Sequence, residues 1–152
     1  MQPRLNFATA LPDSTAAIKS LIAPAWQAGV PSKTLHLVHL RVSQINGCAV
    51  CLHGGAKQAK QHGESDERLF AVAGWRDAPY YSEAERAALA LAECVTRLSD
   101  REDPVPDAVW KEAARHFDEK ELSGLLLWIA TANLFNRLNV PTRQVAGAQK
   151  WD

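Results

Sequence analysis

Two cysteines separated by two residues are the clearest chemical feature of this chain, in the run Cys48-Ala49-Val50-Cys51. Residues three apart lie on nearly the same side of a helix, so both sulfur atoms would face the same surroundings. Gly47 allows the backbone to turn just before the pair, which would place Cys48 at the positive end of a helix dipole and lower the pKa of its thiol. A thiolate with a second thiol nearby can exchange disulfides or reduce a peroxide.

The cysteine pair also has two interpretations without redox chemistry. It could be a buried pair that only packs, because cysteine often behaves as a small core hydrophobe. It could also bind zinc together with His53, or with one of His36 and His39, in a zinc-stabilised or structural oligomer. The chain has no second close cysteine pair, and Cys94 falls in the apolar stripe of a later segment. We therefore expect Cys94 in the core, and no metal or other cofactor.

Two histidines precede the cysteines at a spacing that places both on one helix face, His36 and His39. Their helix is expected to end at Asn46-Gly47, so a helical hairpin could bring either imidazole over the sulfur atoms. An imidazole has an unperturbed pKa near 6.5, which suits it to accept a proton from a thiol. Ordinary surface or boundary positions are the other interpretation of both. His53 lies about 200° around a helix from Cys51, a poor angle for direct contact.

The elements that must position these residues are helical. Helical periodicity or helix start and stop signals mark segments at about residues 14–26, 32–45, 48–62, 66–72, 83–98, 107–116 and 122–138. Ser82 and Asp118 each have a glutamate three residues later, the pattern of a capping box. Pro24 should kink the first helix or split off its last turn. No segment alternates as a strand does, so we expect an all-α, single-domain bundle of about six to seven helices.

Composition excludes several classes of protein. The chain has 152 residues, of which 47% are hydrophobic and 22% charged, as in an ordinary globular domain. Its net charge of zero gives no electrostatic footprint for nucleic acid or an anionic membrane. Three cysteines are too few for a secreted disulfide scaffold, and no targeting or membrane segment is recognisable, so we expect a cytoplasmic protein. Five tryptophans and broad apolar helix faces favour a homo-oligomer.

Two stretches of the sequence carry a resemblance to a known family. The string LRVSQINGCAVCLHGGAKQAKQHGE, followed by WRDAPYYSEAERAALALAECVT, resembles the alkylhydroperoxidase D-like (AhpD) family of the carboxymuconolactone decarboxylase superfamily. The later segment 132–138 is similar to the last helix of that family. The resemblance covers about residues 34–138, and we expect one AhpD-like helical domain over residues 1–152.

The resemblance implies an all-helical subunit that assembles into trimers or hexamers and reduces hydroperoxides through its cysteine pair. It implies that Cys51 is oxidised to a sulfenic acid. Cys48 would then serve as proton donor and close the disulfide, which an unidentified thiol or dithiol reductant reopens. The dipole argument above makes Cys48 the more acidic thiol, but acidity and access to peroxide are separate properties.

The chain departs from the family at the residues that move protons. The family commonly has a glutamate twelve residues before the first cysteine, where this chain has His36. The family histidine four residues after the second cysteine is replaced by Gly55, and Val50 stands directly before that cysteine. His36 would then act as the base, or His53 from a shifted position. General disulfide reduction is the alternative activity; a lactone decarboxylase is disfavoured because its chemistry needs no dithiol.

Overall fold

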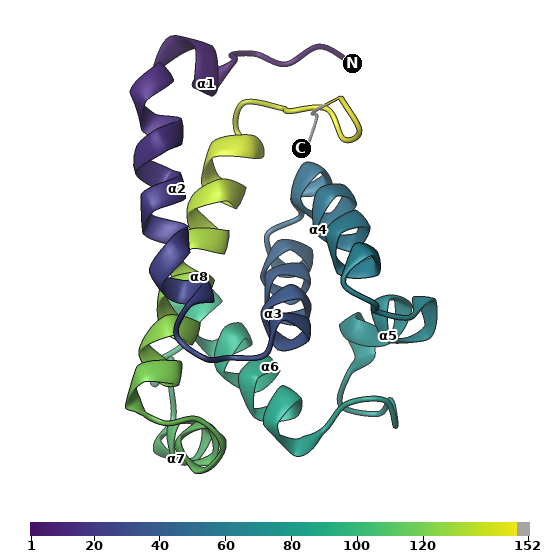
Figure 1. Ribbon diagram of the computed structural model, residues 1–152, viewed down its shortest axis with the longest axis vertical. Coiled ribbons are helices and arrows are strands. Elements are labelled where there is room, and N and C mark those ends of the chain that lie inside the picture. The colour runs from purple at the N-terminus through teal and green to yellow at the C-terminus, as the bar shows by residue number, and fades with distance from the viewer. Residues whose placement is uncertain (149–152) are drawn as a thin grey trace.

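The computed structural model describes residues 1–148, which contain helices and no strand (Figure 1). The elements are α1 (Phe7–Ala10), α2 (Pro12–Trp26), α3 (Ser32–Ile45), α4 (Ala49–Gln61), α5 (Asp66–Ala71), η1 (Val72–Gly74), α6 (Glu83–Thr96), η2 (Leu98–Asp100), α7 (Asp107–His116) and α8 (Glu119–Asn139). The all-α class is therefore confirmed. Trp151, which contributed to the oligomer argument, lies outside the described residues. Within them, no helix is long and apolar enough to cross a membrane.

The number of helices exceeds the prediction because of one short element at the N-terminus. The four-residue helix α1 begins after Asn6, whose side chain accepts a hydrogen bond from the Thr9 backbone N–H at 3.1 Å. A single turn held by its cap has no amphipathic periodicity, so sequence reasoning missed it. The seven predicted segments all appear as helices.

Both predicted capping boxes are present. The Glu85 backbone N–H donates to the Ser82 hydroxyl at 3.2 Å, and the Ser82 N–H donates to the Glu85 carboxylate at 2.8 Å. Asp118 and Glu121 make the same reciprocal pair ahead of α8. Because Asp118 is the cap itself, α8 begins at Glu119, three residues before its predicted start.

Of the two outcomes predicted at Pro24, a kink or a split of the last turn, the split does not occur. Helix α2 continues through Pro24 to Trp26, and the Gln27 N–H still bonds to the Ala23 carbonyl at 3.1 Å. Close packing on α8 holds this turn: a Cβ at Gly124 would lie 2.2 Å from the Ala28 Cβ and 3.1 Å from the Ala25 carbonyl oxygen.

Helix α3 is the central element and is buried on two faces (Figure 1). One face packs Leu35, Val38 and Val42 against α6 and α8. The other face packs Leu37 and Leu40 in a second apolar cluster that includes Trp75 and Leu89. Each such side chain contributes about 1.5–3 kcal/mol on burial, so α3 is a rigid support for whatever its ends carry.

A tight turn joins α3 to α4 and places the cysteines. Gly47 adopts a φ of +66°, the left-handed conformation expected of it, and the Cys48 N–H bonds back to the Ser43 carbonyl at 3.0 Å. Because the turn is short, the first turn of α4 packs against the ends of α3 and α8. The predicted break at Asn46-Gly47 is confirmed.

Candidate functional site

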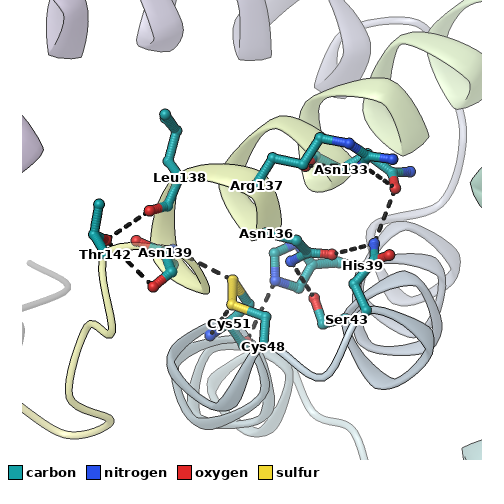
Figure 2. Close-up of a disulfide and its surroundings, with 11 residues drawn as sticks. His39, Ser43, Cys48, Cys51, Asn133, Asn136, Arg137, Leu138, Asn139 and Thr142 are labelled. Carbon is teal, nitrogen blue, oxygen red and sulfur yellow. Dashed lines mark hydrogen bonds between the residues drawn. A yellow bond between two sulfur atoms is a disulfide. The ribbon is translucent and has the colours of Figure 1, made fainter.

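Cys48 and Cys51 form a disulfide at the start of α4 (Figure 2). Cys48 is the N-cap residue of this helix, and its sulfur accepts a hydrogen bond from the Cys51 backbone N–H at 3.3 Å. Each cysteine is only 1% exposed. The sequence argument placed Cys48 at the positive end of a helix dipole, and the structure confirms that location.

A side chain from the end of α8 contacts the second sulfur. The Asn139 amide donates to the Cys51 sulfur at 3.4 Å, and Figure 2 shows it reaching from the last turn of the helix. Phe135, one turn earlier, packs against the apolar cluster that Val50 forms with the two cysteines. Within residues 1–148, the hydrogen bonds of both sulfurs therefore come from neutral N–H groups.

A network of side-chain amides fastens the turn before Cys48 to α8. The Asn46 amide donates to the side-chain oxygens of Asn133 at 2.9 Å and Asn136 at 2.8 Å. Asn136 in turn donates to the Ser43 hydroxyl at 3.1 Å and is 1% exposed. These bonds fix the end of α3, the turn and α8 relative to one another, and so fix the cysteine pair.

Sequence reasoning did not identify the asparagines as functional residues. Asn133, Asn136 and Asn139 recur at every third position of a helix. Asparagine is a poor helix former because its amide competes for the backbone. Its repeated use on one side of α8 is the signal that could have indicated a polar partner across the helix.

His39 is the histidine that lies beside the disulfide (Figure 2). Its Nε2 is 3.3 Å from the Cys51 carbonyl oxygen, and because a carbonyl only accepts, Nε2 carries the hydrogen in this pair. Burial lowers the pKa of His39 to about 4, so the imidazole is neutral at pH 7. Its Nδ1 is then an acceptor, and it is buried with no partner among the described residues.

The imidazole of His39 fills the space above Gly55. A Cβ at Gly55 would lie 2.8 Å from His39 Cδ2 and 3.3 Å from its Nε2. The family histidine implied by the resemblance belongs at position 55, on α4. In this chain the His39 imidazole from α3 occupies that space. The His39 ring fits there because Gly55 has no side chain.

His36 and His53 have other surroundings. His62 Nδ1 lies 2.9 Å from the Gln58 carbonyl oxygen and 3.2 Å from His36 Nε2; because the carbonyl only accepts, Nδ1 carries the hydrogen, and these two acceptors share it. Burial, with the neighbouring His62 and His39, lowers the pKa of His36 to about 4. His53 is exposed, and a Cβ at Gly147 would lie 3.6 Å from its Nε2. The described contacts bring neither to the sulfurs, and their catalytic roles stay predictions.

Two observations bear on the structural and zinc-binding interpretations of the cysteines. Cys94 is free, 5% exposed, and packed within α6, which confirms its predicted core position. Among residues 1–148, no group of three or more histidine, cysteine, aspartate or glutamate side chains is arranged to hold a metal ion.

Comparisons with known proteins agree with this geometry. The chain is 29% identical over 140 residues to the uncharacterized protein YdfG of Bacillus subtilis, covering 92% of this chain and 94% of YdfG. A crystal structure from Agrobacterium tumefaciens, of a protein of unknown function suggested to be an antioxidant defence protein AhpD, superposes with a TM-score of 0.90. It is 30% identical, with 97% of this chain and 100% of that chain covered.

One further match concerns the fold and another the family. The debrominase Bmp8, in complex with 2,3,4-tribromopyrrole, shares the fold with a TM-score of 0.79 at 22% identity, covering 92% of this chain and 74% of Bmp8. The model of the carboxymuconolactone decarboxylase family matches residues 12–93, which include α2, α3, the cysteine pair and most of α6. This protein therefore belongs to the carboxymuconolactone decarboxylase family and is an AhpD-like member of it.

Proposed function

We propose that this protein is an antioxidant enzyme that reduces hydroperoxides by cycling Cys48 and Cys51 between dithiol and disulfide. The observation that carries the proposal is the cysteine pair itself: two sulfurs close enough to bond, at a helix N-terminus, each with an N–H donor. Such donors stabilise the thiolate, which is the reactive form. Membership of an AhpD-like family supports the same chemistry.

The reaction balances without a cofactor. The Cys51 thiolate attacks the terminal oxygen of a hydroperoxide, the O–O bond breaks, and the leaving alkoxide takes a proton to become an alcohol. Cys51 is then a sulfenic acid. The Cys48 thiolate attacks its sulfur, the S–S bond forms, and the hydroxyl leaves with a proton as water. A thiol or dithiol reductant supplies two electrons and two protons to restore both thiols.

His39 is proposed as the histidine of this site. It occupies the space that a side chain at position 55 would take, and its pKa of about 4 keeps it a neutral imidazole at pH 7. It holds the first turn of α4 through the Cys51 carbonyl, which makes it a positioning residue. This assignment replaces His36 and His53 as the preferred candidate, because neither has a described contact with the cysteines.

Burial favours a small oxidant over general disulfide reduction. Both cysteines are 1% exposed, with Phe135 and Asn139 of α8 packed on them. A hydroperoxide is small enough to reach a buried sulfur through local motion. A disulfide in a folded protein would have to bring one of its sulfur atoms into contact with Cys48 or Cys51, and burial prevents that. The pair is thus better suited to small peroxides than to protein disulfides.

Single-cysteine variants test the proposed chemistry. With cumene hydroperoxide as oxidant and dithiothreitol as reductant, Cys51→Ser should abolish turnover, about a thousandfold or more, because the attacking sulfur is lost. With the protein reduced beforehand and the dithiothreitol removed, Cys48→Ser should consume one peroxide per chain and then stop, because no second cysteine is left to resolve the sulfenic acid. Cys94→Ser is the matched control and should retain full activity. Turnover by Cys51→Ser at the rate of the unmodified protein would refute the proposal.

A swap of the histidine tests the role of His39. Replacing His39 by glycine should lower turnover, and so should Gly55→His alone, because its Cβ would collide with the His39 ring. The double variant carrying both changes returns one imidazole to the same space and should recover activity above either single variant. His36→Gln is the control that removes another buried imidazole. Failure of the double variant to exceed both singles, with all three folded, would remove His39 from the site.

A further inference from the structure

The two sulfurs lie between helix ends of opposite polarity. Cys48 caps the N-terminus of α4, where unpaired N–H groups carry partial positive charge. Asn139 is the last residue of α8, and its side chain contacts Cys51. The end of α8 presents carbonyl groups, which carry partial negative charge and oppose a thiolate nearby. On helix ends alone, Cys48 would be the more acidic thiol and Cys51 the less acidic one.

The Asn139 side chain reverses the polarity that α8 presents to Cys51. Its amide N–H donates to the Cys51 sulfur at 3.4 Å, so a donor rather than a carbonyl faces the atom that would carry charge. The main chain of the residue is held in place, since the Gln144 N–H bonds to the Asn139 carbonyl at 3.1 Å and the Thr142 hydroxyl does so at 3.3 Å. A hydrogen bond to an ionised acceptor is about twice as strong as one to a neutral acceptor.

We propose that Asn139 is a catalytic residue that stabilises the Cys51 thiolate against the unfavourable end of α8 and so assists the attack of Cys51 on peroxide. The inference rests on the proposed function, because a catalytic role assumes that Cys51 reacts with peroxide. The pKa of the Cys51 thiol, however, can be measured without any peroxide. It gives Cys51 a donor of its own, beside the one that the Cys51 backbone N–H supplies to Cys48, so each sulfur has a hydrogen-bond donor.

The test measures the pKa of Cys51 in a Cys48→Ser background, from the pH dependence of alkylation by iodoacetamide followed on the Cys51 peptide by mass spectrometry. Asn139→Leu removes the donor and should raise the pKa of Cys51 by about one unit, a tenfold loss of thiolate. Asn139→Asp replaces the donor with a negative acceptor of the same shape and should raise that pKa further. Val140→Ala, a truncation of the exposed neighbouring residue, should leave it unchanged.

The order of the Cys51 pKa values in the two Asn139 variants distinguishes an electrostatic effect from damage to the fold. A purely structural role would move Asn139→Leu and Asn139→Asp together, or move the Val140→Ala control as well. An unchanged pKa in the Asp variant, which is nearly isosteric, would overturn the inference even where the Leu variant fails to fold. A wild-type protein that ignores peroxide while the variants still show the predicted pKa order would refute the proposed function and leave the Asn139–Cys51 interaction standing.

Discussion

The hydrogen-bond donors to the disulfide sulfurs are neutral, whereas two of the three donors to Glu93 on α6 are charged. The Asn139 amide bonds to the Cys51 sulfur, the amides of Asn46 and Asn136 tie the turn before Cys48 to α8, and Arg137 joins this network only through the Asn133 side-chain oxygen. Glu93 is 6% exposed and accepts from Arg41 at 2.7 Å, from Arg76 at 2.8 Å and from Trp75 at 2.9 Å. Both clusters tie α3 to a neighbouring helix, but only one of them contains reactive atoms.

The difference in charge has a chemical consequence. Burial alone would raise the pKa of Glu93, but its hydrogen bonds from Arg76, Trp75 and Arg41 lower it to about 2, so it remains a carboxylate that holds its partners. A carboxylate or guanidinium at the disulfide would instead shift the thiol pKa values strongly in one direction. Within residues 1–148, no charged side chain hydrogen-bonds to either sulfur, whereas the charged cluster ties α3 to α6 through Arg41 and Glu93.

Removing the carboxylate of Glu93 should have the largest effect on stability and little effect on the chemistry. Glu93→Gln leaves Arg41 without its ion pair at a mostly buried position, which should lower the free energy of unfolding by about 3–5 kcal/mol. Urea unfolding measures this loss. Peroxide reduction per folded molecule should be unchanged, and a parallel fall of activity in the folded fraction would mean that the two clusters are coupled.

The two buried histidines of α3 and Glu93 of α6 should respond to acid in different pH ranges. His36 and His39 have pKa values near 4 in the fold against 6.5 unfolded, so the unfolded chain binds protons first and stability falls as pH drops from about 6.5 to 4. The loss is at most about 3 kcal/mol for each histidine. Glu93, lowered from 4.5 to about 2, loses its contribution between those values.

Variants assign each phase of that acid profile. Urea midpoints measured from pH 8 to pH 3 should lose the upper phase in a His36→Gln, His39→Gln double variant and keep the lower one. Glu93→Gln should do the reverse. An upper phase that survives the double variant would show that other groups cause it.

A substitution in the amide network should have a smaller effect on stability, and the effect should be local to the turn before Cys48. Asn46→Ala removes the donor to Asn133 and Asn136 and should cost about 1–2 kcal/mol, because two side-chain oxygens lose a partner. The turn before Cys48 should loosen, so amide exchange at residues 47–51 should accelerate more than exchange in α6. Uniform acceleration over both regions would indicate a global loss instead.

Much of the fold followed from local patterns in the sequence. Capping boxes at Ser82 and Asp118 and the turn at Gly47 depend on residues within a few positions of one another, so the sequence contains their whole cause. The split predicted as one outcome at Pro24 does not occur, and the residues that follow it, Ala25 and Ala28, pack against Gly124 of a helix far along the chain. Local sequence patterns indicate the conformation that the backbone prefers, and contacts between distant segments determine whether the folded chain adopts it.

At the candidate site, too, some positions follow from neighbouring residues and others depend on tertiary contacts. The position of Cys48 at a helix N-terminus follows from the glycine before it and could be predicted. The choice of His39 over His36 could not, because it depends on the close approach of α3 to Gly55 on α4. Asn139 reaches Cys51 across 88 residues of sequence, and the periodic asparagines of α8 are the only local trace of it.

The central claim is that the cysteine pair transfers two electrons to a hydroperoxide. The most direct measurement is to reduce the protein, remove the reductant, add one equivalent of cumene hydroperoxide without oxygen, and count thiols while mapping disulfides by mass spectrometry. The account predicts that three thiols per chain fall to one, that one equivalent of alcohol forms, and that the Cys48 and Cys51 peptides become linked. Three intact thiols beside unconsumed peroxide would contradict it.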